Sequence, residues 1–503
     1  MRNLVSLRTM MTAALLLTLS SCGGRSEPSP PAPPILRLVP DAQVDLSQHP
    51  LKYRDCNLIF VSLDALQAAH VGCLGHHRNV TPTIDRLARH SCVFTNTMSV
   101  ASWTVPSSMT WFTGVYPTEH RLTNKFAVYN DREQQRARLG ELAPQLLTMG
   151  DMLAKNGYAT AAFTGNAGVS RDFGFGQGFN VYWHETGKFG GLEQSVPRAI
   201  EWLRANSSRK FALFLHGYDC HAQYALDAGF DYRFVAANYD RRYTGSPREH
   251  EMLREEGLDH GQLALRPADI QFWRAIYDER IQRADAHLAS FLTALDELGL
   301  AENTLLVVTS DHGTEYYEHR RFDHGFTLYQ ELLHVPLFIR LPDQPGCRIV
   351  TDRVSSIDLL PTLFDLLDLE LSEPMLAQLR GQSLVPTLRG AAANRDIISE
   401  TDYREYTFKR SLISPDGWKL VYTLETRSRE LFDLNTDPLE LVDVAAQHPQ
   451  RADELERRLF EFYRRLGHDL QARTWRPGLN PVYDSQGAKP ATGAKSMLEP
   501  PGR

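Results

Sequence analysis

The stretch CNLIFVSLDA, residues 56–65, decides the fold class of this chain. It is an unbroken apolar run that ends in an acidic residue, Asp64, and such runs are typical of strands buried on both faces of a parallel sheet. The same character predicts further strands in four later stretches, which are YATAAFTGN (158–166), KFALFLHGYD (210–219), NTLLVVTSDHG (303–313) and HVPLFIRLP (334–342).

Helical patterns alternate with these strands. Amphipathic periodicity predicts helices over residues 81–91, 146–157, 195–206 and 276–299. Alternation of this kind predicts an α/β fold with a doubly wound, mainly parallel sheet flanked by helices. A polar and aromatic insert, residues 225–272, interrupts the pattern and is expected to fold over the edge of the sheet.

The C-terminal part of the chain has a different sequence pattern. Short strand patterns appear over residues 410–425 and 429–435, and an amphipathic helix follows over 449–466. We therefore expect the α/β domain to span 55–394 and a small α+β subdomain to span 395–474. The tail, 475–503, is rich in Pro and Gly and is expected to be flexible.

The N-terminus has the pattern of an export signal. Arg2 and Arg8 precede a short apolar run over residues 10–19, which is too brief to cross a membrane. This pattern predicts a signal peptide over residues 1–21. Because a cysteine follows Leu-Ser-Ser, the site resembles bacterial lipoprotein processing sites and predicts lipidation of Cys22. A plain cleaved signal with an incidental cysteine is the alternative.

The segment after the signal is expected to be a spacer. Residues 22–54 begin with the predicted lipidated cysteine and contain a Pro-rich stretch over 26–40, which favours semi-rigid polyproline structure. The sequence thus predicts an exported protein, lipid-anchored to a membrane, at the outer membrane or the periplasmic face.

Composition narrows the classes of function. The chain has 503 residues, 42% of them hydrophobic, and a formal net charge of −7. This is an ordinary globular composition, and the acidic balance argues against a nucleic-acid partner. The number and spacing of the other cysteines fit no metal or disulfide framework; they are Cys56, Cys73, Cys92, Cys220 and Cys347. Cys220 is expected to be buried and to take no part in the chemistry.

Acids and histidines gather where the predicted strands end. Ligands of open α/β sheets bind beyond the carboxyl ends of the strands, and carboxylates with imidazoles suit a divalent or transition metal. One such acid alone is more often a helix cap or a turn former, but several strand ends carry these groups together. The candidates are Asp64, His216, Asp219, His221, Asp311, His312, His319 and His324.

The stretch SWTVPSSMT, residues 102–110, supplies a candidate nucleophile. Pro106 suits the first turn of a helix, so Thr104 is expected just before that helix begins. The positive helix end favours an alkoxide, and a nearby metal would lower the hydroxyl's pKa. A purely structural role for Thr104 as a helix cap is the alternative.

With these residues in view, the chain resembles the sulfatases of the alkaline phosphatase superfamily over about residues 55–465. TVPSSMTWFTGVYPTEH (104–120) is similar to the family's nucleophile segment, Cys/Ser-x-Pro-Ser-Arg followed by Leu-Thr-Gly. The other segments that carry the resemblance include NLIFVSLDALQAAHVGCLG (57–75), LFLHGYDCHAQY (213–224), TLLVVTSDHGTEYYEH (304–319) and RELFDLNTDPLELVDVA (429–445).

The resemblance implies a role for each matching position. Asp64, Asp311 and His312 would bind one divalent metal (Ca, Mg, Mn or Zn), with Thr104 reaching it as the nucleophile. His221 stands where the family has a His on the ester oxygen, and His324 stands where many members have a Lys. A second ion, or the substrate, would involve His216 and Asp219.

Five departures from the family pattern bear on the chemistry. Thr104 stands where sulfatases convert Cys or Ser to formylglycine, so no formylglycine is expected. Ala65 replaces a second Asp, Ser108 replaces an Arg, and Asn166 stands in the motif that usually carries Lys-x-His. His312 replaces an Asn and suits a softer metal than calcium, such as zinc or manganese.

These observations predict a metal-dependent hydrolase of sulfate or phosphate/phosphonate esters at the cell envelope. The expected substrate is a small-molecule, glycan or lipid ester, and the predicted membrane contact is the lipid anchor. Two alternatives remain open. One is a transferase that moves a phospho-headgroup onto an envelope glycan or lipid. The other is a non-catalytic, sugar-binding pseudoenzyme.

Overall fold

The computed structural model describes residues 38, 43–123, 142–186, 189–222, 226, 229–260, 263–342, 346–403 and 407–470. The predicted signal peptide, Cys22 and the tail 475–503 lie outside these residues. Part of the expected spacer is described, and there Leu46, Leu51 and Tyr53 are buried in the hydrophobic core. The chain therefore packs onto the α/β domain before residue 55.

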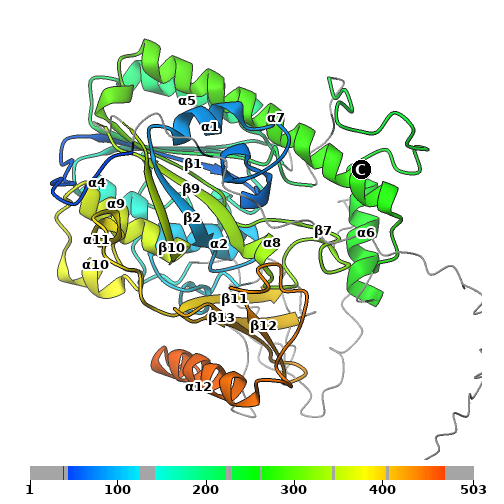
Figure 1. Cartoon of the computed structure of the whole chain (residues 1–503). Helices are drawn as coiled ribbons and strands as arrows, with labels where there is room; N and C mark the ends of the chain where they lie inside the picture. Colours follow the sequence, from blue (N-terminus) through cyan, green and yellow to red (C-terminus); the bar gives the residue numbers. More distant parts are fainter. Residues whose placement is uncertain are drawn as a thin grey trace, which may run out of the picture. The chain divides into compact units, whose positions relative to one another are not determined.

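One sheet of eight strands forms the centre of the α/β domain (Figure 1). Its strand order is β10-β2-β9-β6-β1-β5-β3-β4. In this sheet β9 alone runs antiparallel to its neighbours, β2 and β6. The doubly wound, mainly parallel sheet is confirmed. The strands are β1 Asn57–Leu63, β2 Cys92–Met98, β3 Ala159–Thr164, β4 Val181–His184, β5 Phe211–Gly217, β6 Thr304–Thr309, β9 His334–Arg340 and β10 Arg348–Ser355.

Helices cover both faces of this sheet, and the alternation of side chains along β1 shows why. Phe60 packs into the core on one face, while Ile59 and Val61 pack into the core on the other. Because successive side chains of a strand point to opposite faces, a continuous apolar run requires cover on both. The first face is covered by α2 Thr104–Thr113, α4 Met149–Lys155 and α9 Leu359–Leu366, and the second by α1 Pro82–Ala88, α5 Leu192–Asn206 and α7 Pro267–Glu297.

The polar insert forms a helix that packs beside a short hairpin. Helix α6, Pro247–His260, places the His250 ring 4.5 Å from the Phe322 ring, centroid to centroid. Phe322 belongs to β8, Phe322–Asp323, which pairs with β7, Glu315–Tyr316. This hairpin follows the carboxyl end of β6, so the insert reaches the edge of the sheet where ligands are expected.

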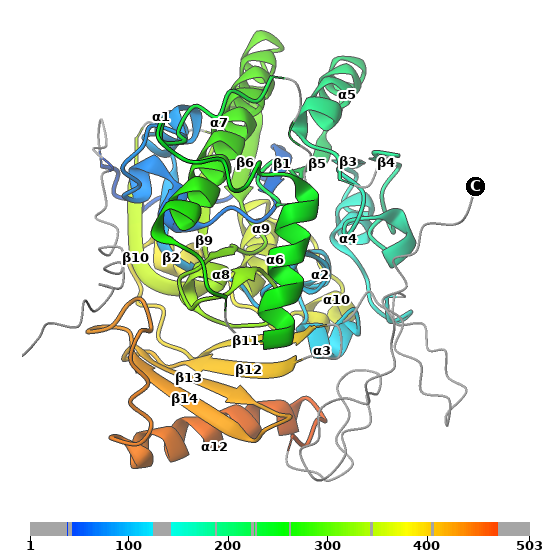
Figure 2. The ribbon, with the colours of Figure 1, turned by 90° about the vertical axis from the view of Figure 1, so that its right-hand side faces the viewer.

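A second sheet forms the C-terminal subdomain. Its four antiparallel strands lie in the order β11-β12-β13-β14, and a helix packs along one face (Figure 2). The predicted small α+β subdomain is confirmed. Its elements are β11 Ile397–Tyr403, β12 Thr407–Ile413, β13 Trp418–Thr423, β14 Ser428–Asp433 and α12 Pro449–Arg465. The remaining short helices are α3 Pro117–His120, α8 Gln330–Leu333, α10 Glu373–Gln378 and α11 Val385–Leu388.

Two further observations concern the cysteines and the membrane. The cysteines of the described part of the chain form no disulfide; they are Cys56, Cys73, Cys92, Cys220 and Cys347. Burial raises the pKa of Cys220 well above its usual value, as for an inert buried thiol. Among the helices of the described ranges, none has both the length and the hydropathy of a membrane span.

Candidate active site

Two carboxylates and an imidazole meet beyond the carboxyl ends of two adjacent strands. Asp64 follows β1, and Asp311 and His312 follow β6, its hydrogen-bonded neighbour. One ligand atom from each of the three lies within 4.8 Å of the others, and all three side chains are fully buried. Parallel pairing brings these strand ends to one edge of the sheet, which is where the sequence placed them.

The hydrogen bonds of His312 prepare one of its nitrogens for a metal. Nδ1 lies 2.6 Å from the carbonyl oxygen of Gly313. Since a carbonyl only accepts, Nδ1 donates, and Nε2 is left with a lone pair. Nε2 faces Asp64 Oδ1 at 3.8 Å and Asp311 Oδ2 at 3.5 Å. This is the arrangement of a metal-ligating histidine oriented by a backbone carbonyl.

Each of the two acids has one carboxylate oxygen that faces His312. Within the described residues, Asp64 Oδ1 and Asp311 Oδ2 are buried and unbonded. The other oxygen of Asp311 accepts from the backbone N–H groups of Ala65 (3.2 Å) and His312 (3.0 Å). Burial and the nearby charge of Asp311 raise the pKa of Asp64 well above its usual value. Two buried acids with unbonded oxygens aimed at one point fit a divalent cation, which would neutralise both.

Thr104 places its hydroxyl beside Asp64, Asp311 and His312. It is the first residue of α2, one position later than expected, and its Oγ1 lies 3.3 Å from His312 Nε2. Ser107, in the same helix, is engaged elsewhere, because its hydroxyl bonds the carbonyl of Ala101 at 2.8 Å and Ser99 Oγ at 3.1 Å. Of these two hydroxyls, the one on Thr104 faces the acids.

Three further histidines surround the same point. His216 Nε2 lies 3.3 Å from Asp64 Oδ2, and His221 Nε2 lies 3.9 Å from Asp64 Oδ1. The His324 ring stacks on His312, with centroids 4.5 Å apart, and lies 4.9 Å from the ring of His221. Burial lowers the pKa of His216 to about 4, so this imidazole is neutral at physiological pH. The structure thus gathers His216, His221 and His324 around the candidate metal ligands.

Two other sequence candidates have contacts elsewhere. Asp219 Oδ2 accepts from the backbone N–H of Leu192 at 2.8 Å, at the start of α5. Its predicted role at a second metal or the substrate stays a prediction. His319 lies 2.6 Å from Glu331 Oε1 and 3.0 Å from the carbonyl of Glu440. Although burial lowers its pKa, the charge of Glu331 raises it to about 10, so this imidazole is the charged partner of Glu331 in the metal-free protein.

The structure also shows residues near the site that the sequence reasoning did not select. Asp323 forms an ion pair with His324, and helix α6 supplies Arg254, whose Nη1 lies 3.4 Å from Asp323 Oδ2. Burial raises the pKa of Asp323, but the charges of His324 and His250 outweigh it and hold that pKa well below its usual range. The insert therefore helps to orient His324 through an ionised carboxylate.

Tyr218 is the other unselected neighbour. Its ring lies 4.6 Å from the ring of His216, and its hydroxyl oxygen accepts from the backbone N–H of Gly168 at 2.8 Å. No local sequence signal marked it, because an aromatic residue after a buried strand usually belongs to the core.

Gly168 packs directly against the candidate nucleophile, and this gives a prediction. A Cβ at this position would lie 3.1 Å from Cβ and Cγ2 of Thr104 and 3.1 Å from the hydroxyl of Tyr218. Because small displacements of reacting groups cost large factors in rate, Gly168→Ala is expected to lower kcat about tenfold or more. Steady-state kinetics on the best ester substrate measure this.

Gly257→Ala is the matched control. Its new Cβ would lie 3.6–3.9 Å from the side chain of Leu263, which is ordinary van der Waals contact, so wild-type turnover is expected. Equal activity of the two variants would contradict the placement of Thr104 in the reaction.

Comparison with known proteins assigns the chain to a class and then to a family. The fold is that of the alkaline phosphatase-like superfamily. The profile of the sulfatase family matches residues 56–369, and the profile described as N-sulphoglucosamine sulphohydrolase, C-terminal, matches residues 317–465. The chain belongs to the sulfatase family. This family generally binds a divalent metal, and the Asp64–Asp311–His312 group offers ligands for one.

Three proteins that are similar to this chain are two sulfatases and a phosphonate monoester hydrolase. Arylsulfatase K of Bos taurus is 26% identical over 295 residues, which are 53% of this chain and 54% of the bovine protein. The chain thus spans about half the length of that relative. The delta 4,5-hexuronate-2-O-sulfatase of Bacteroides thetaiotaomicron is 24% identical over 86% of this chain and 95% of its own. The phosphonate monoester hydrolase of Agrobacterium radiobacter superposes with a TM-score of 0.63 at 19% identity, over 82% of this chain and 96% of its own.

Proposed function

We propose that this protein is a metal-dependent hydrolase that uses Thr104 as its nucleophile and prefers phosphate or phosphonate esters to sulfate esters. The observation that carries the proposal is the threonine hydroxyl, 3.3 Å from His312 Nε2 at the start of α2. Threonine is not a substrate for the maturation that makes formylglycine, so the nucleophile is a permanent hydroxyl.

The proposed reaction assigns a role to each group around this hydroxyl. Asp64, Asp311 and His312 would hold a divalent metal, which supplies charge that lowers the pKa of the hydroxyl. The N-terminus of α2 faces the ester and favours its negative oxygens. Thr104 Oγ1, after releasing its proton to solvent, attacks the central atom, and the bond from that atom to the leaving oxygen breaks as the threonyl ester forms. His324, oriented by Asp323, is placed to protonate the leaving oxygen, and His221 contacts the ester oxygens.

The preference for phosphorus follows from the second half of the reaction. Formylglycine hydrate releases sulfate by breaking its own C–O bond, a route that threonine lacks. A threonyl ester must instead be cleared by water at the central atom, and phosphorus accepts this attack more readily than sulfur. Since about 1.4 kcal/mol of barrier is tenfold in rate, even a modest difference dominates turnover.

Side-by-side turnover tests this preference. With matched aryl phosphate, aryl phosphonate, bis-aryl phosphate and aryl sulfate, and with several metals, we expect kcat/KM for the best phosphorus ester to exceed that for the sulfate by tenfold or more. Each substrate is also assayed with the Thr104→Ala variant, which identifies turnover by contaminants. Many turnovers on the sulfate with none on the phosphorus esters would contradict the preference.

A second candidate is sulfate ester hydrolysis, which the names of the relatives favour. The hexuronate 2-O-sulfatase aligns with 86% of this chain, so a sulfated hexuronate is the corresponding substrate class. The same assay, extended to such a sugar, decides between the two.

We further propose that the enzyme acts at the cell envelope, held there by lipid on Cys22. The support is the signal-like N-terminus with its cysteine after Leu-Ser-Ser. The full-length protein is expected in the membrane fraction, and Cys22→Ala is expected to move it to the soluble fraction. Equal membrane association of both proteins would contradict the anchor.

A further inference from the structure

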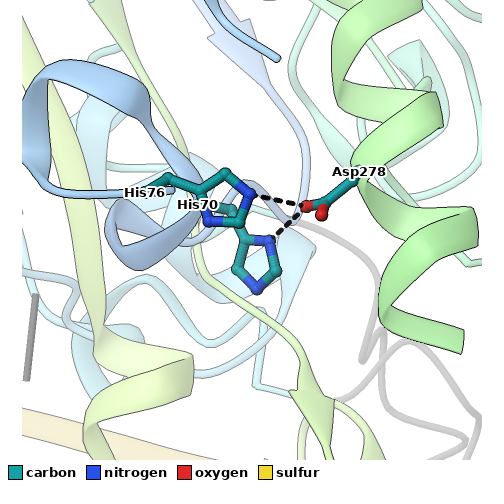
Figure 3. A group of neighbouring side chains, drawn as sticks. All are labelled: His70, His76 and Asp278. Carbon is teal, nitrogen blue, oxygen red and sulfur yellow. Dashed lines mark hydrogen bonds and ion pairs between the residues drawn. The ribbon is translucent and has the colours of Figure 1, made fainter. Parts of the chain in front are cut away.

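A second group of metal-ligating side chains lies outside the active site (Figure 3). His70 ends the 3₁₀ turn Ala68–His70, His76 follows the turn Gly72–Leu74, and Asp278 projects from α7. His70 Nδ1 lies 2.6 Å and His76 Nε2 lies 3.2 Å from the same oxygen, Asp278 Oδ1. The reaction proposed above uses none of these residues.

The group is buried but close to the surface. The exposed fractions are 8% for His70, 7% for His76 and 1% for Asp278. Both imidazoles point at the carboxylate from the same side, as Figure 3 shows. Although it is close to Asp278, His76 Nε2 is a buried nitrogen that makes no hydrogen bond to the described residues. An imidazole nitrogen that faces a buried carboxylate oxygen without a hydrogen bond of good geometry is placed to share an ion with that oxygen.

We propose that His70, His76 and Asp278 form a second divalent-metal site that takes a borderline ion such as Zn²⁺. The ligand atoms are His70 Nδ1, His76 Nε2 and Asp278 Oδ1. Two imidazoles and one carboxylate are a common three-ligand zinc set, with the fourth position left for water. Tetrahedral sites with bonds of about 2.0 Å hold their ligand atoms about 3.3 Å apart. The 3.2 Å between His76 and Asp278 matches this spacing.

The His70 ring must move slightly away from Asp278 Oδ1 to reach that geometry. Its 2.6 Å contact with Asp278 Oδ1 is a hydrogen bond in the metal-free cluster. The metal takes the place of this hydrogen, and the neutral imidazole carries its proton on Nε2 instead.

Arg78 does not compete for the same oxygen. Its Nη1 donates to Asp278 Oδ2 at 2.6 Å and leaves Oδ1 to the imidazoles. A partner on the outer oxygen fixes the carboxylate, as second-layer contacts do in other metal sites. The nearby Arg274 is turned away, with its Nη2 3.0 Å from Glu318 Oε1.

The position suggests what the ion does. Tyr277, next to Asp278, donates its hydroxyl to the carbonyl of Ala65 at 2.6 Å and accepts from the backbone N–H of Gln67 at 2.9 Å. Ala65 follows the active-site Asp64 and has a φ of 62°, an uncommon conformation for alanine. A metal on His70, His76 and Asp278 would fasten this segment to α7 and so hold Asp64 in place.

Zinc binding by a protein that lacks the active-site acids tests the proposal. The Asp64→Ala/Asp311→Ala double variant, stripped with chelator, is dialysed against Zn²⁺ alone. We expect one Zn²⁺ per chain, and none after His76→Ala is added. His77→Ala is the matched control, because His77 is exposed and adjacent but is not one of the three ligands; it should retain one Zn²⁺. Co²⁺ in place of Zn²⁺ should show the visible absorption of a four-coordinate ion.

Two results would overturn the proposal: no Zn²⁺ on the double variant, or equal Zn²⁺ on the His76→Ala and His77→Ala versions. His70→Gln replaces His76→Ala if circular dichroism shows that the latter is unfolded. Wild-type protein separates this proposal from the active-site one. If wild type binds one Zn²⁺ per chain, as the double variant does, and loses it in the His76→Ala variant, the active-site assignment fails and this site stands.

Discussion

Thr104→Ala is expected to lower kcat by about a thousandfold or more on every ester that the enzyme hydrolyses. Removal of a catalytic nucleophile costs several orders of magnitude, and what remains comes from binding and charge stabilisation. The structural basis is the position of the hydroxyl, 3.3 Å from His312 Nε2. Steady-state kinetics with purified protein, at equal metal content, measure the effect.

The control is another hydroxyl of the same helix. Ser107 is equally buried, but its hydroxyl bonds the carbonyl of Ala101, so Ser107→Ala should stay within about tenfold of wild type. Thr104→Ser keeps the nucleophilic oxygen and should retain most of the activity. If Thr104→Ala turns over at the wild-type rate while Ser107→Ala is inactive, the nucleophile has been misassigned.

The Asp64→Ala and Asp311→Ala variants are expected to lose both bound metal and activity. Each removes a carboxylate whose inward oxygen is buried and unbonded among the described residues, and so leaves a cation without its charge partner. We expect the active-site metal content to fall from one ion per chain to near zero, and kcat to fall by about a thousandfold or more. Elemental analysis after dialysis reports the metal loss as one ion per chain fewer than in wild type, and ester turnover reports the loss of activity.

Asp285→Asn is the control for the Asp64→Ala and Asp311→Ala variants. Asp285 is a buried acid on α7 that accepts from the backbone N–H groups of Thr83 and Ile84, so it supports a helix start and binds no ligand. Its variant should keep metal and turnover even if its free energy of unfolding falls. Undiminished active-site metal in the protein lacking both Asp64 and Asp311 would contradict the metal assignment.

In the central sheet, the sequence predicted five strands that are buried on both faces, and it missed β2, β4 and β10. The apolar runs at β1, β3, β5, β6 and β9 were recognised because doubly covered strands lack polar positions. β10, with the sequence RIVTDRVS at the edge of the sheet, mixes charged and apolar residues and gave no such run. The antiparallel direction of β9 was also invisible, because an apolar run reports burial and not orientation.

The site was predictable where residues follow strands and hidden where the fold brings distant segments together. Asp64, Asp311 and His312 could be placed because parallel strands present their carboxyl ends at one edge. Arg254 and Asp323 could not, since their contact joins positions 69 residues apart through the packing of the insert. The His70–Asp278 pair spans 208 residues, and only the docking of α7 reveals it.

The most direct test of the account is the chemical state of Thr104 during turnover. Acid quenching of the enzyme with an excess of aryl phosphate, followed by mass spectrometry of the peptide that contains residue 104, traps the covalent intermediate. The account predicts unmodified threonine in the resting enzyme and one phosphoryl group on Thr104 in the quenched enzyme, absent from Thr104→Ala. A phosphoryl group on another residue, or turnover with no adduct on Thr104 at any quench time in the approach to steady state, would contradict it.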